Sequence, residues 1–383
     1  MISIGNKNEE LPMTEKTIDS FFEKIQDHRH HNKIHKLIDV IIIAICGVVA
    51  GADTYEQIEN FGKKRKKWLL KFLELPHGIP SHDTFGRIFE RINPNEFQNS
   101  FMGWIAAVTE QTKGQVIAID GKTLRRSHDK SNDKKAIHMI SAWASSNQVI
   151  LGQLKTEEKS NEITAIPNLL KLLDISGCII TIDAMGTQKK IAKTIIDKNG
   201  DYIFALKENH KTLYAETVLF FYKMESMKKE GYTFDEHTTV NGGHGRIETR
   251  RSVMTSDIDW LEDKGSWPGL RGIGMVESTR EIKGECSFEK RYYISSIECD
   301  AKKFGSSVRD HWGIENSVHW VLDIAFREDE SRVRTGSAPE NFAAIRHIAL
   351  NLLRNNKTFK GSVKTKRLNA AMDLKYLEEV IFK

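Results

Sequence analysis

Cysteine is scarce in this chain, which has four among 383 residues. The four are Cys46, Cys178, Cys286 and Cys299, and no pair has the spacing of zinc ligands. So few cysteines in so long a chain make a framework of disulfides implausible. The composition therefore favours a reducing compartment, and we expect a cytoplasmic protein.

Long apolar segments are also missing. The first residues, MISIGNKNEELPM, lack the apolar segment of a signal peptide. The most apolar run, residues 38–52, is shorter than the ~20 residues that span a bilayer, and it contains Asp39. This run predicts a buried core helix, and we expect no membrane partner.

A strong net charge is absent too: the formal charge is +5, which by itself does not identify a nucleic-acid partner. The local distribution says more, because clusters of cations bind a polyanion. One cluster, residues 63–67, is equally typical of a solvated helix face. The others flank carboxylates, and we expect them to contact DNA: Lys122, Arg125, Arg126, Arg332 and Arg334.

The first part of the chain, residues 1–112, predicts a helical domain of a kind that can dock on DNA. Its pattern indicates helices at 14–25, 38–51, 55–73, 81–92 and 96–112, separated by tight breaks. Within HDTFGRIFER, Arg87 and Arg91 could face a DNA groove. Plain helix packing is an equal alternative for this segment.

The rest of the chain predicts an α/β fold. Strands at 116–119, 137–144, 149–155, 178–182 and 202–206, with helices at 161–173 and 187–199, predict a mixed sheet. We expect a catalytic core at 113–208 and 285–355. Residues 209–284 predict a β-rich insertion, with one hairpin turning at Asn241-Gly242-Gly243. Helices are expected at 309–325 and 339–355, and residues 356–383 form a basic C-terminal tail.

Three carboxylates carry the functional prediction. Asp120 ends the strand in QVIAIDGKTLRRS, Asp183 ends the strand in GCIITIDAMGTQ, and Glu315 lies in the helical RDHWGIENSVHWVLD. A single strand-end aspartate is most often a turn former. Two of them with a helical glutamate favour a site for two divalent metal ions roughly 3.5–4 Å apart, which activate a water or a 3′-hydroxyl. The pattern predicts a nuclease or strand-transferase acting on nucleic acid.

Cations and aromatic residues surround Glu315. Arg309, His311 and His319 could hold a phosphate, or they could pair with nearby acids on the surface. Trp312 and Trp320 could stack on an unpaired base, although core packing is the usual role of tryptophan.

Several motifs resemble one family. IAIDGKTLRRS, TIDAMGTQ, ALKENH, GHGRIETRR, HWGIENSVHWVLDIAFREDESRVRTGSAPENFAAIRHIALNLL and the N-terminal GIPSHDTFGRIF resemble DDE-type insertion-sequence transposases of the H-repeat-associated group, over residues 20 to 360. The resemblance implies a ribonuclease-H-like core, an acidic triad of Asp120, Asp183 and Glu315, and dependence on Mg²⁺, with Mn²⁺ as a substitute. It also implies binding and cleavage at terminal inverted repeats and a β-rich insertion before the glutamate.

The chain departs from related transposases in one signature. The Tyr, Arg and Lys that often accompany the catalytic glutamate are replaced by Val308, His311 and Leu322. We expect Arg309 and His319 to substitute. Transposition requires two DNA ends to meet, so we expect a homodimer or larger synaptic assembly. The alternatives are a catalytically idle, repeat-associated DNA-binding protein and a stand-alone nuclease.

Overall fold

The chain folds into two compact units. The computed structural model describes residues 17–29, 33–109, 114–128, 135–156, 162–226, 231–243 and 245–382. The sheet unit comprises Gln111–Thr123 and His138–His319. The helical unit comprises Met1–Glu110, Leu124–Ile137 and Trp320–Lys383, so it is built from both ends of the chain.

The helical unit packs its helices around α2, the apolar run of the sequence. Residues 40–46 of α2 are fully buried, which confirms the predicted core helix. Within the described residues, no helix has both the length and the apolar character needed to span a bilayer. The helices are α1 (Ile18–Phe22), α2 (Leu37–Val49), α3 (Tyr55–Leu69), α4 (His82–Arg91), α5 (Pro94–Val108), α10 (Trp320–Phe326), α11 (Ala338–Asn355), α12 (Val363–Met372) and α13 (Leu374–Phe382).

The last two helices, α12 and α13, were not expected from the basic sequence of residues 356–383. Arg367 of α12 is buried, and its guanidinium donates to the carbonyls of Val48 (2.9 Å) and Ala52 (3.1 Å) and pairs with Asp53 (2.9 Å). Carbonyls at a helix C-terminus have no partner within their own helix. Arg367 therefore caps the end of α2 and links α12 to the N-terminal helices.

The sheet unit contains one nine-stranded mixed sheet in the order β3-β2-β1-β4-β5-β9-β8-β7-β6. β1 runs parallel to β4 and β4 to β5, whereas every other neighbouring pair is antiparallel. The strands are β1 (Val116–Thr123), β2 (His138–Ala144), β3 (Val149–Thr156), β4 (Ile179–Ile182), β5 (Asp201–Leu206), β6 (Asp235–Gly243), β7 (Arg246–Thr255), β8 (Gly272–Ile282) and β9 (Glu285–Ser295). The predicted combination of a mixed α/β sheet with N-terminal helices is confirmed.

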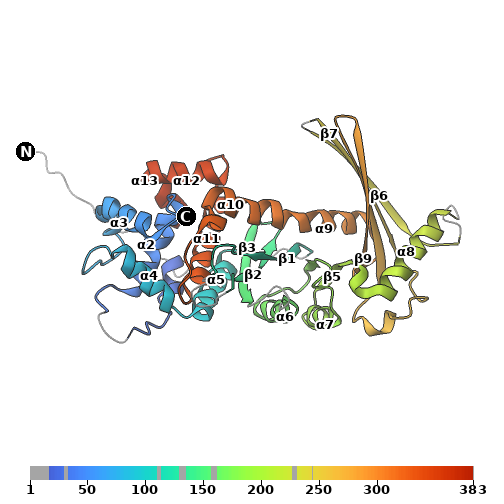
Figure 1. Cartoon of the computed structure of the whole chain (residues 1–383), viewed down its shortest axis with the longest axis horizontal. Helices are drawn as coiled ribbons and strands as arrows, with labels where there is room; N and C mark the ends of the chain where they lie inside the picture. Colours follow the sequence, from blue (N-terminus) through green and yellow to red (C-terminus); the bar gives the residue numbers. More distant parts are fainter. Residues whose placement is uncertain are drawn as a thin grey trace, which may run out of the picture. The chain divides into compact units, whose positions relative to one another are not determined.

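Helices cover both faces of this sheet. Figure 1 shows α6 (Glu162–Leu172) and α7 (Lys189–Asp197) on one face and α9 (Ala301–Gly313) on the other. α9 approaches the sheet closely, because a Cβ at Gly274 of β8 would lie 2.4 Å from the ring of Phe304. α8 (Lys211–Ser226) lies where the sequence pattern indicated no helix.

The long antiparallel strands turn tightly. β8 and β9 are joined by Lys283 and Gly284, which have φ angles of 51° and 85°, as a two-residue type I′ turn requires. The turn predicted at residues 241–243 is wrong in position. Those residues pair with β7 as part of β6, and the chain reverses after Gly243.

The helix that carries Glu315 also differs from the prediction. α9 begins at Ala301 rather than near Arg309, because the Asp300 side chain accepts from the Lys303 amide (2.8 Å) and caps it. Residues Ile314–His319 then form a π-helical segment. Such segments are rare and occur frequently at functional sites.

Candidate active site

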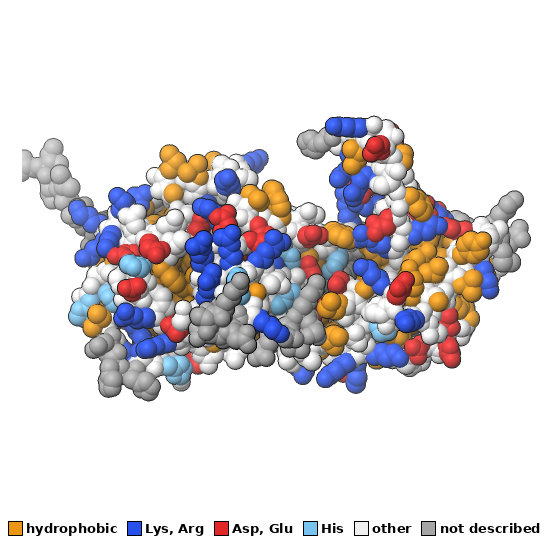
Figure 2. Space-filling view, in the orientation of Figure 1, with side chains coloured by type: hydrophobic (Ala, Val, Ile, Leu, Met, Phe, Trp, Pro, Cys, Tyr) orange, Lys and Arg blue, Asp and Glu red, His pale blue; other side chains and the backbone are white. Residues whose placement is uncertain are grey.

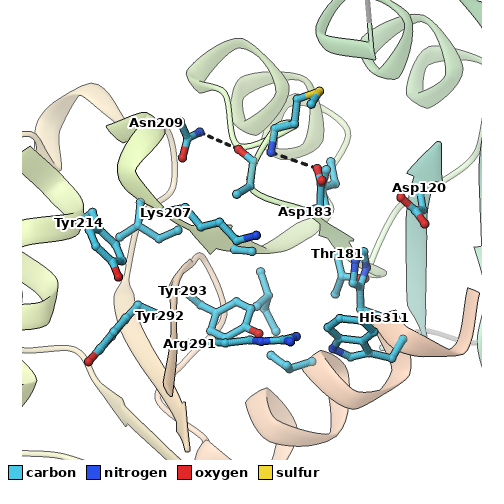
Figure 3. Close-up of a pocket in the computed structure, with 18 of the residues that line it drawn as sticks. Asp120, Thr181, Asp183, Lys207, Asn209, Tyr214, Arg291, Tyr292, Tyr293 and His311 are labelled. Carbon is cyan, nitrogen blue, oxygen red and sulfur yellow. Dashed lines mark hydrogen bonds between the residues drawn. The ribbon is translucent and has the colours of Figure 1, made fainter. Parts of the chain in front are cut away.

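The three predicted carboxylates line one cavity of about 930 Å³ in the sheet unit. β1 and β4 are parallel neighbours in which Ile119 pairs with Ile182, so Asp120 and Asp183 occupy the next position on each chain. Glu315 comes from the π-helical segment that follows α9. Figure 3 shows Asp120 and Asp183 at the same end of the cavity.

Asp183 is held by a tight turn after β4. Its Oδ1 accepts from the amides of Met185 (3.1 Å) and Gly186 (3.2 Å). A Cβ at Gly186 would lie 2.2 Å from the Ile182 side chain, so this turn needs glycine. The turn fixes one carboxylate oxygen by backbone hydrogen bonds.

Asp120 lies in a strongly acidic environment. Its pKa is raised to about 7, chiefly by burial and in addition by the negative charges of Asp183, Glu162 and Glu315. Its Oδ1 accepts from the Gly121 amide (2.9 Å), which partly offsets these effects. A site that disfavours carboxylate charge when empty favours a bound cation.

A buried pair, His138 and Glu162, lies beside Asp120 and was not predicted from the sequence. His138 Nε2 and Glu162 Oε1 are 2.5 Å apart, and His138 Nδ1 lies 2.9 Å from the Thr123 hydroxyl. A Cβ at Gly121 would lie 2.3 Å from His138 Nε2 and 2.6 Å from Glu162 Oε1. Glycine after Asp120 therefore makes room for this pair, and nothing in the spacing of the three residues indicated it.

The two predicted histidines have different environments. Burial lowers the pKa of His311 to about 4, and its Nδ1 lies 3.1 Å from the Thr181 hydroxyl, so the ring is neutral near pH 7. His319 Nδ1 lies 3.5 Å from Asp120 Oδ2. Lys122 Nζ lies 3.5 Å from the His319 carbonyl. The structure thus brings His319 to Asp120 and Lys122 to His319, and phosphate binding by the histidines stays a prediction.

The remaining predicted cations are distributed over both units. Arg309 of α9 is exposed in the sheet unit. In the helical unit, Arg125 Nε lies 3.2 Å from Asp329 Oδ2, and Arg334 donates to the Arg126 carbonyl (3.1 Å). Three further cations that were predicted to contact DNA are exposed in the helical unit: Arg87, Arg91 and Arg332. Their contacts with DNA stay predictions.

Neither tryptophan near Glu315 packs in a core. Trp312 is 41% exposed and Trp320 is 61% exposed, which contradicts the alternative of core packing. The Arg291 guanidinium lies 4.4 Å from the centre of the Trp312 ring. Trp312 thus presents an aromatic surface at the rim of the cavity.

Several residues of the cavity were not singled out from the sequence. Lys207 and Asn209 follow the parallel strand β5, just as Asp183 follows β4, and Asn209 donates to the Ala184 carbonyl (2.7 Å; Figure 3). Their position after a parallel strand could have identified them. Arg291, Tyr292 and Tyr293 come from β9, whose pairing with β5 the sequence does not specify.

The donor chemistry of the cavity fits a hard divalent cation. Its acids supply carboxylate oxygens, the ligands that Mg²⁺ prefers. Among the described residues, no three His, Cys, Asp or Glu side chains are grouped closely enough to hold a metal by themselves.

Comparison with known proteins identifies the family. The family described as "Transposase DDE domain" matches residues 111–352, and the one described as "DDE_Tnp_1-associated" matches residues 20–105. The chain belongs to the DDE transposases.

Two relatives are similar over nearly their whole length. "Putative transposase YncI" of Escherichia coli O157:H7 is 44% identical, covering 96% of this chain and 95% of that protein. "H repeat-associated putative transposase YhhI" of Escherichia coli (strain K12) is 42% identical over 93% of this chain and 95% of that protein. The resemblance to the H-repeat-associated group is thus confirmed.

Proposed function

We propose that this transposase cleaves DNA at the terminal inverted repeats of an insertion sequence and joins the freed 3′-hydroxyl ends to target DNA. The observation that carries the proposal is the lining of one cavity by Asp120, Asp183 and Glu315. Membership of the DDE transposases and names such as "putative transposase" among the relatives support it.

The proposed domain roles follow the chain. Strands β1–β5 and β9 with α9 are assigned to a ribonuclease-H-like catalytic core at 113–208 and 285–355. The segment 209–284, with α8 and β6–β8, is assigned to the β-rich insertion. Residues 1–112 are proposed to bind DNA ends, and the basic segment 356–383 completes the chain.

Asp120, Asp183 and Glu315 are the proposed ligands of Mg²⁺, with Mn²⁺ as a substitute. These residues would hold the cation, which would supply activation of the attacking water or hydroxyl and stabilisation of charge on the leaving oxygen. The chain's own residues prepare the site. The Asp183 turn fixes one carboxylate oxygen, and the raised pKa of Asp120 means that this group releases a proton when it binds a cation.

The proposed substrate is double-stranded DNA, at the element ends and at the target. Two ends must be held together for strand transfer, so a homodimer or larger synaptic assembly is the proposed active form. Exposed cations in both units supply sequence-independent contacts to phosphates.

The test is cleavage of a labelled duplex that carries the inverted repeats flanking the gene. Asp120→Asn, Asp183→Asn and Glu315→Gln should each abolish Mg²⁺-dependent nicking while leaving DNA binding intact. Asp310→Asn is the matched control, since Asp310 is an exposed acid of α9 outside the cavity. Retention of wild-type nicking by the Asp120 variant would refute the proposed triad.

The same assay separates the alternatives. Nicked products without joined ends, identified by sequencing, indicate a stand-alone nuclease. DNA binding without nicking in Mg²⁺ or Mn²⁺ indicates an idle binding protein. The second outcome has a parallel by name, because "Inactive transposase YbfQ" of Escherichia coli (strain K12) is 40% identical over 16% of this chain and 75% of its own length.

A further inference from the structure

A second concave surface of the sheet unit is lined by arginines. It is a groove of about 650 Å³ between α9 and one face of β7–β9. The basic residues lining it, which we call the arginine groove, are Arg246, Arg250, Arg280, Arg291 and Arg309. Only two acids, Glu248 and Glu289, line it as well, so the groove is net positive.

The pattern of each strand places these side chains on one face. On β7, Arg246, Glu248 and Arg250 alternate, and alternate residues of a strand point to the same side. Cross-strand pairing then sets Arg280 of β8 opposite Glu248. The register of these strands therefore places the arginines on the face that lines the groove.

The charge in the groove is only partly neutralised. Glu248 is buried, and its carboxylate forms ion pairs with three arginines: Arg250 at 2.6 Å, Arg280 at 3.3 Å and Arg246 at 3.7 Å. Burial and the positive charges of Arg309, Arg280 and Arg246 lower the pKa of Arg250, although Glu248 opposes this. Glu289 pairs with Arg291 (2.7 Å), so Glu248 alone offsets the charges of Arg246, Arg250 and Arg280. The groove therefore keeps a net positive charge that suits an anionic ligand.

Arg309 supplies the opposite wall. It lies on α9 on the same side as Gly305, Trp312 and Asn316, at helical spacing. It is exposed, and within the described residues no ion pair engages its side chain. Its charge is thus available to a ligand in the groove.

The arginine groove is continuous with the acidic cavity. Both are lined by Glu289, Arg291, Tyr293, Val308 and Trp312. At this junction the exposed Trp312 ring stacks with Arg291. Figure 2 shows lysine and arginine side chains gathered along the projecting β6–β9 strands on their side nearer α9.

We propose that the arginine groove binds the phosphodiester backbone of the DNA strand that continues from the phosphate held at Asp120, Asp183 and Glu315. This rests on the proposed function. Guanidinium groups bind phosphate oxygens in a bidentate manner, and backbone contacts position a nucleic acid without reading its sequence. The Trp312 ring can stack on a base at the point where the strand leaves the acidic cavity.

The test measures binding of a labelled 30-base-pair duplex of arbitrary sequence to the full chain in EDTA, so that cleavage cannot interfere. The Arg246→Gln/Arg309→Gln double variant should bind more weakly at every salt concentration. The slope of log K against log salt should fall in magnitude by about 2, since each lost phosphate contact removes roughly 0.9. Both side chains are exposed, so the fold should be unaffected.

The matched control is Arg271→Gln/Lys302→Gln, which removes two exposed charges next to β8 and on α9 but outside the groove. It should keep the wild-type slope. A second readout is tryptophan fluorescence, because DNA in the groove covers Trp312. Trp312→Phe should remove part of the quenching that DNA causes.

The outcomes separate this proposal from the proposed function. If the groove variant binds with the wild-type slope, or Trp312→Phe leaves the quenching unchanged, the groove proposal is overturned. If the wild-type chain binds no DNA at all, both proposals are overturned. If the groove variant weakens binding but the wild-type chain never cleaves its element ends, the groove proposal stands and the proposed function fails.

Discussion

The acidic cavity and the arginine groove share a helix and a sheet but carry opposite charge. The cavity gathers Asp120, Asp183 and Glu208 from β1 and from the segments that follow β4 and β5, and Glu315 from the segment after α9. The groove gathers its arginines along the antiparallel strands β7–β9 and on α9. The difference shows how one scaffold can offer an acidic cavity to metal ions and, next to it, a basic groove to phosphate groups.

The largest expected effect separates chemistry from binding. Glu315→Gln should lower the cleavage rate by ~10²–10³ or more, as for other losses of charge stabilisation at a reacting centre. It should leave DNA affinity equal to that of the wild type or slightly higher, because it removes negative charge from the cavity. Single-turnover cleavage and equilibrium binding measure the two quantities. A loss of both cleavage rate and DNA affinity would contradict the assignment of chemistry to the cavity and of binding to the groove.

A smaller effect is expected from crowding the buried pair beside Asp120. Gly121→Ala would push a Cβ against His138 and Glu162, displacing Asp120 and destabilising the fold by about 1–3 kcal/mol. Cleavage should fall by roughly 10–100-fold, as when partners that orient metal ligands are lost.

The matched control for that substitution is Gly242→Ala, where a Cβ would meet nothing within 4 Å. Thermal melts and cleavage rates should leave this variant close to the wild type. Equal behaviour of the two alanine variants would show that the close approach at Gly121 has no consequence.

The raised pKa of Asp120 predicts a pH-dependent gain of stability when the charge is removed. Between the ordinary aspartate pKa near 4 and the folded value of about 7, the folded chain keeps a proton that the unfolded chain releases. The charge therefore costs stability fully above pH 7 and not at all below pH 4. Asp120→Asn should raise the free energy of unfolding by no more than about 4 kcal/mol at pH 8, the equivalent of a three-unit difference in pKa, with the gain vanishing toward pH 4.

Denaturant titrations across this pH range check the prediction, and Mg²⁺ provides an internal comparison. Added Mg²⁺ should stabilise the wild-type chain at pH 8 through binding to the folded state, and should stabilise the variant less. A gain that is the same at pH 4 and pH 8 would mean that the Asp120 charge is not its source.

The smallest effect is expected at His311. Because its ring is neutral near pH 7, His311→Gln keeps a neutral hydrogen-bonding group near Thr181 and should change the cleavage rate by no more than about threefold. The pH profile between 6 and 9 should be unchanged. A large loss that follows protonation in this range would instead identify His311 as a phosphate-binding cation.

The sequence predicted most of the sheet because its signals are local. Short apolar runs and their order predict β1–β5. Asp183 follows β4 as expected, but the prediction that Asp120 ends its strand is wrong: β1 continues to Thr123, and Asp120 pairs with Ser141 of β2. The sequence pattern does not predict α8, although Leu213, Phe220, Phe221 and Met224 have helical spacing, because the polar residues that follow favour β structure.

The features that escaped prediction depend on tertiary pairing. The arginine groove arises from the register of β7 with β8, which sets Glu248 against Arg280 across two strands. The pair of His138 and Glu162 joins a strand to a helix 24 residues later. Burial of Arg367 depends on carbonyls more than 300 residues away. No local pattern contains this information.

The contact between Arg367 and the end of α2 has a consequence for synthesis. Ribosomes release a chain from its N-terminus, so the sheet unit is complete once His319 has emerged. The helical unit must wait for its final segment, Trp320–Lys383. A copy of the gene that is cut short before codon 363 would therefore encode a complete sheet unit but an incomplete helical unit. The carbonyls of Val48 and Ala52 at the end of α2 would then lack the Arg367 guanidinium.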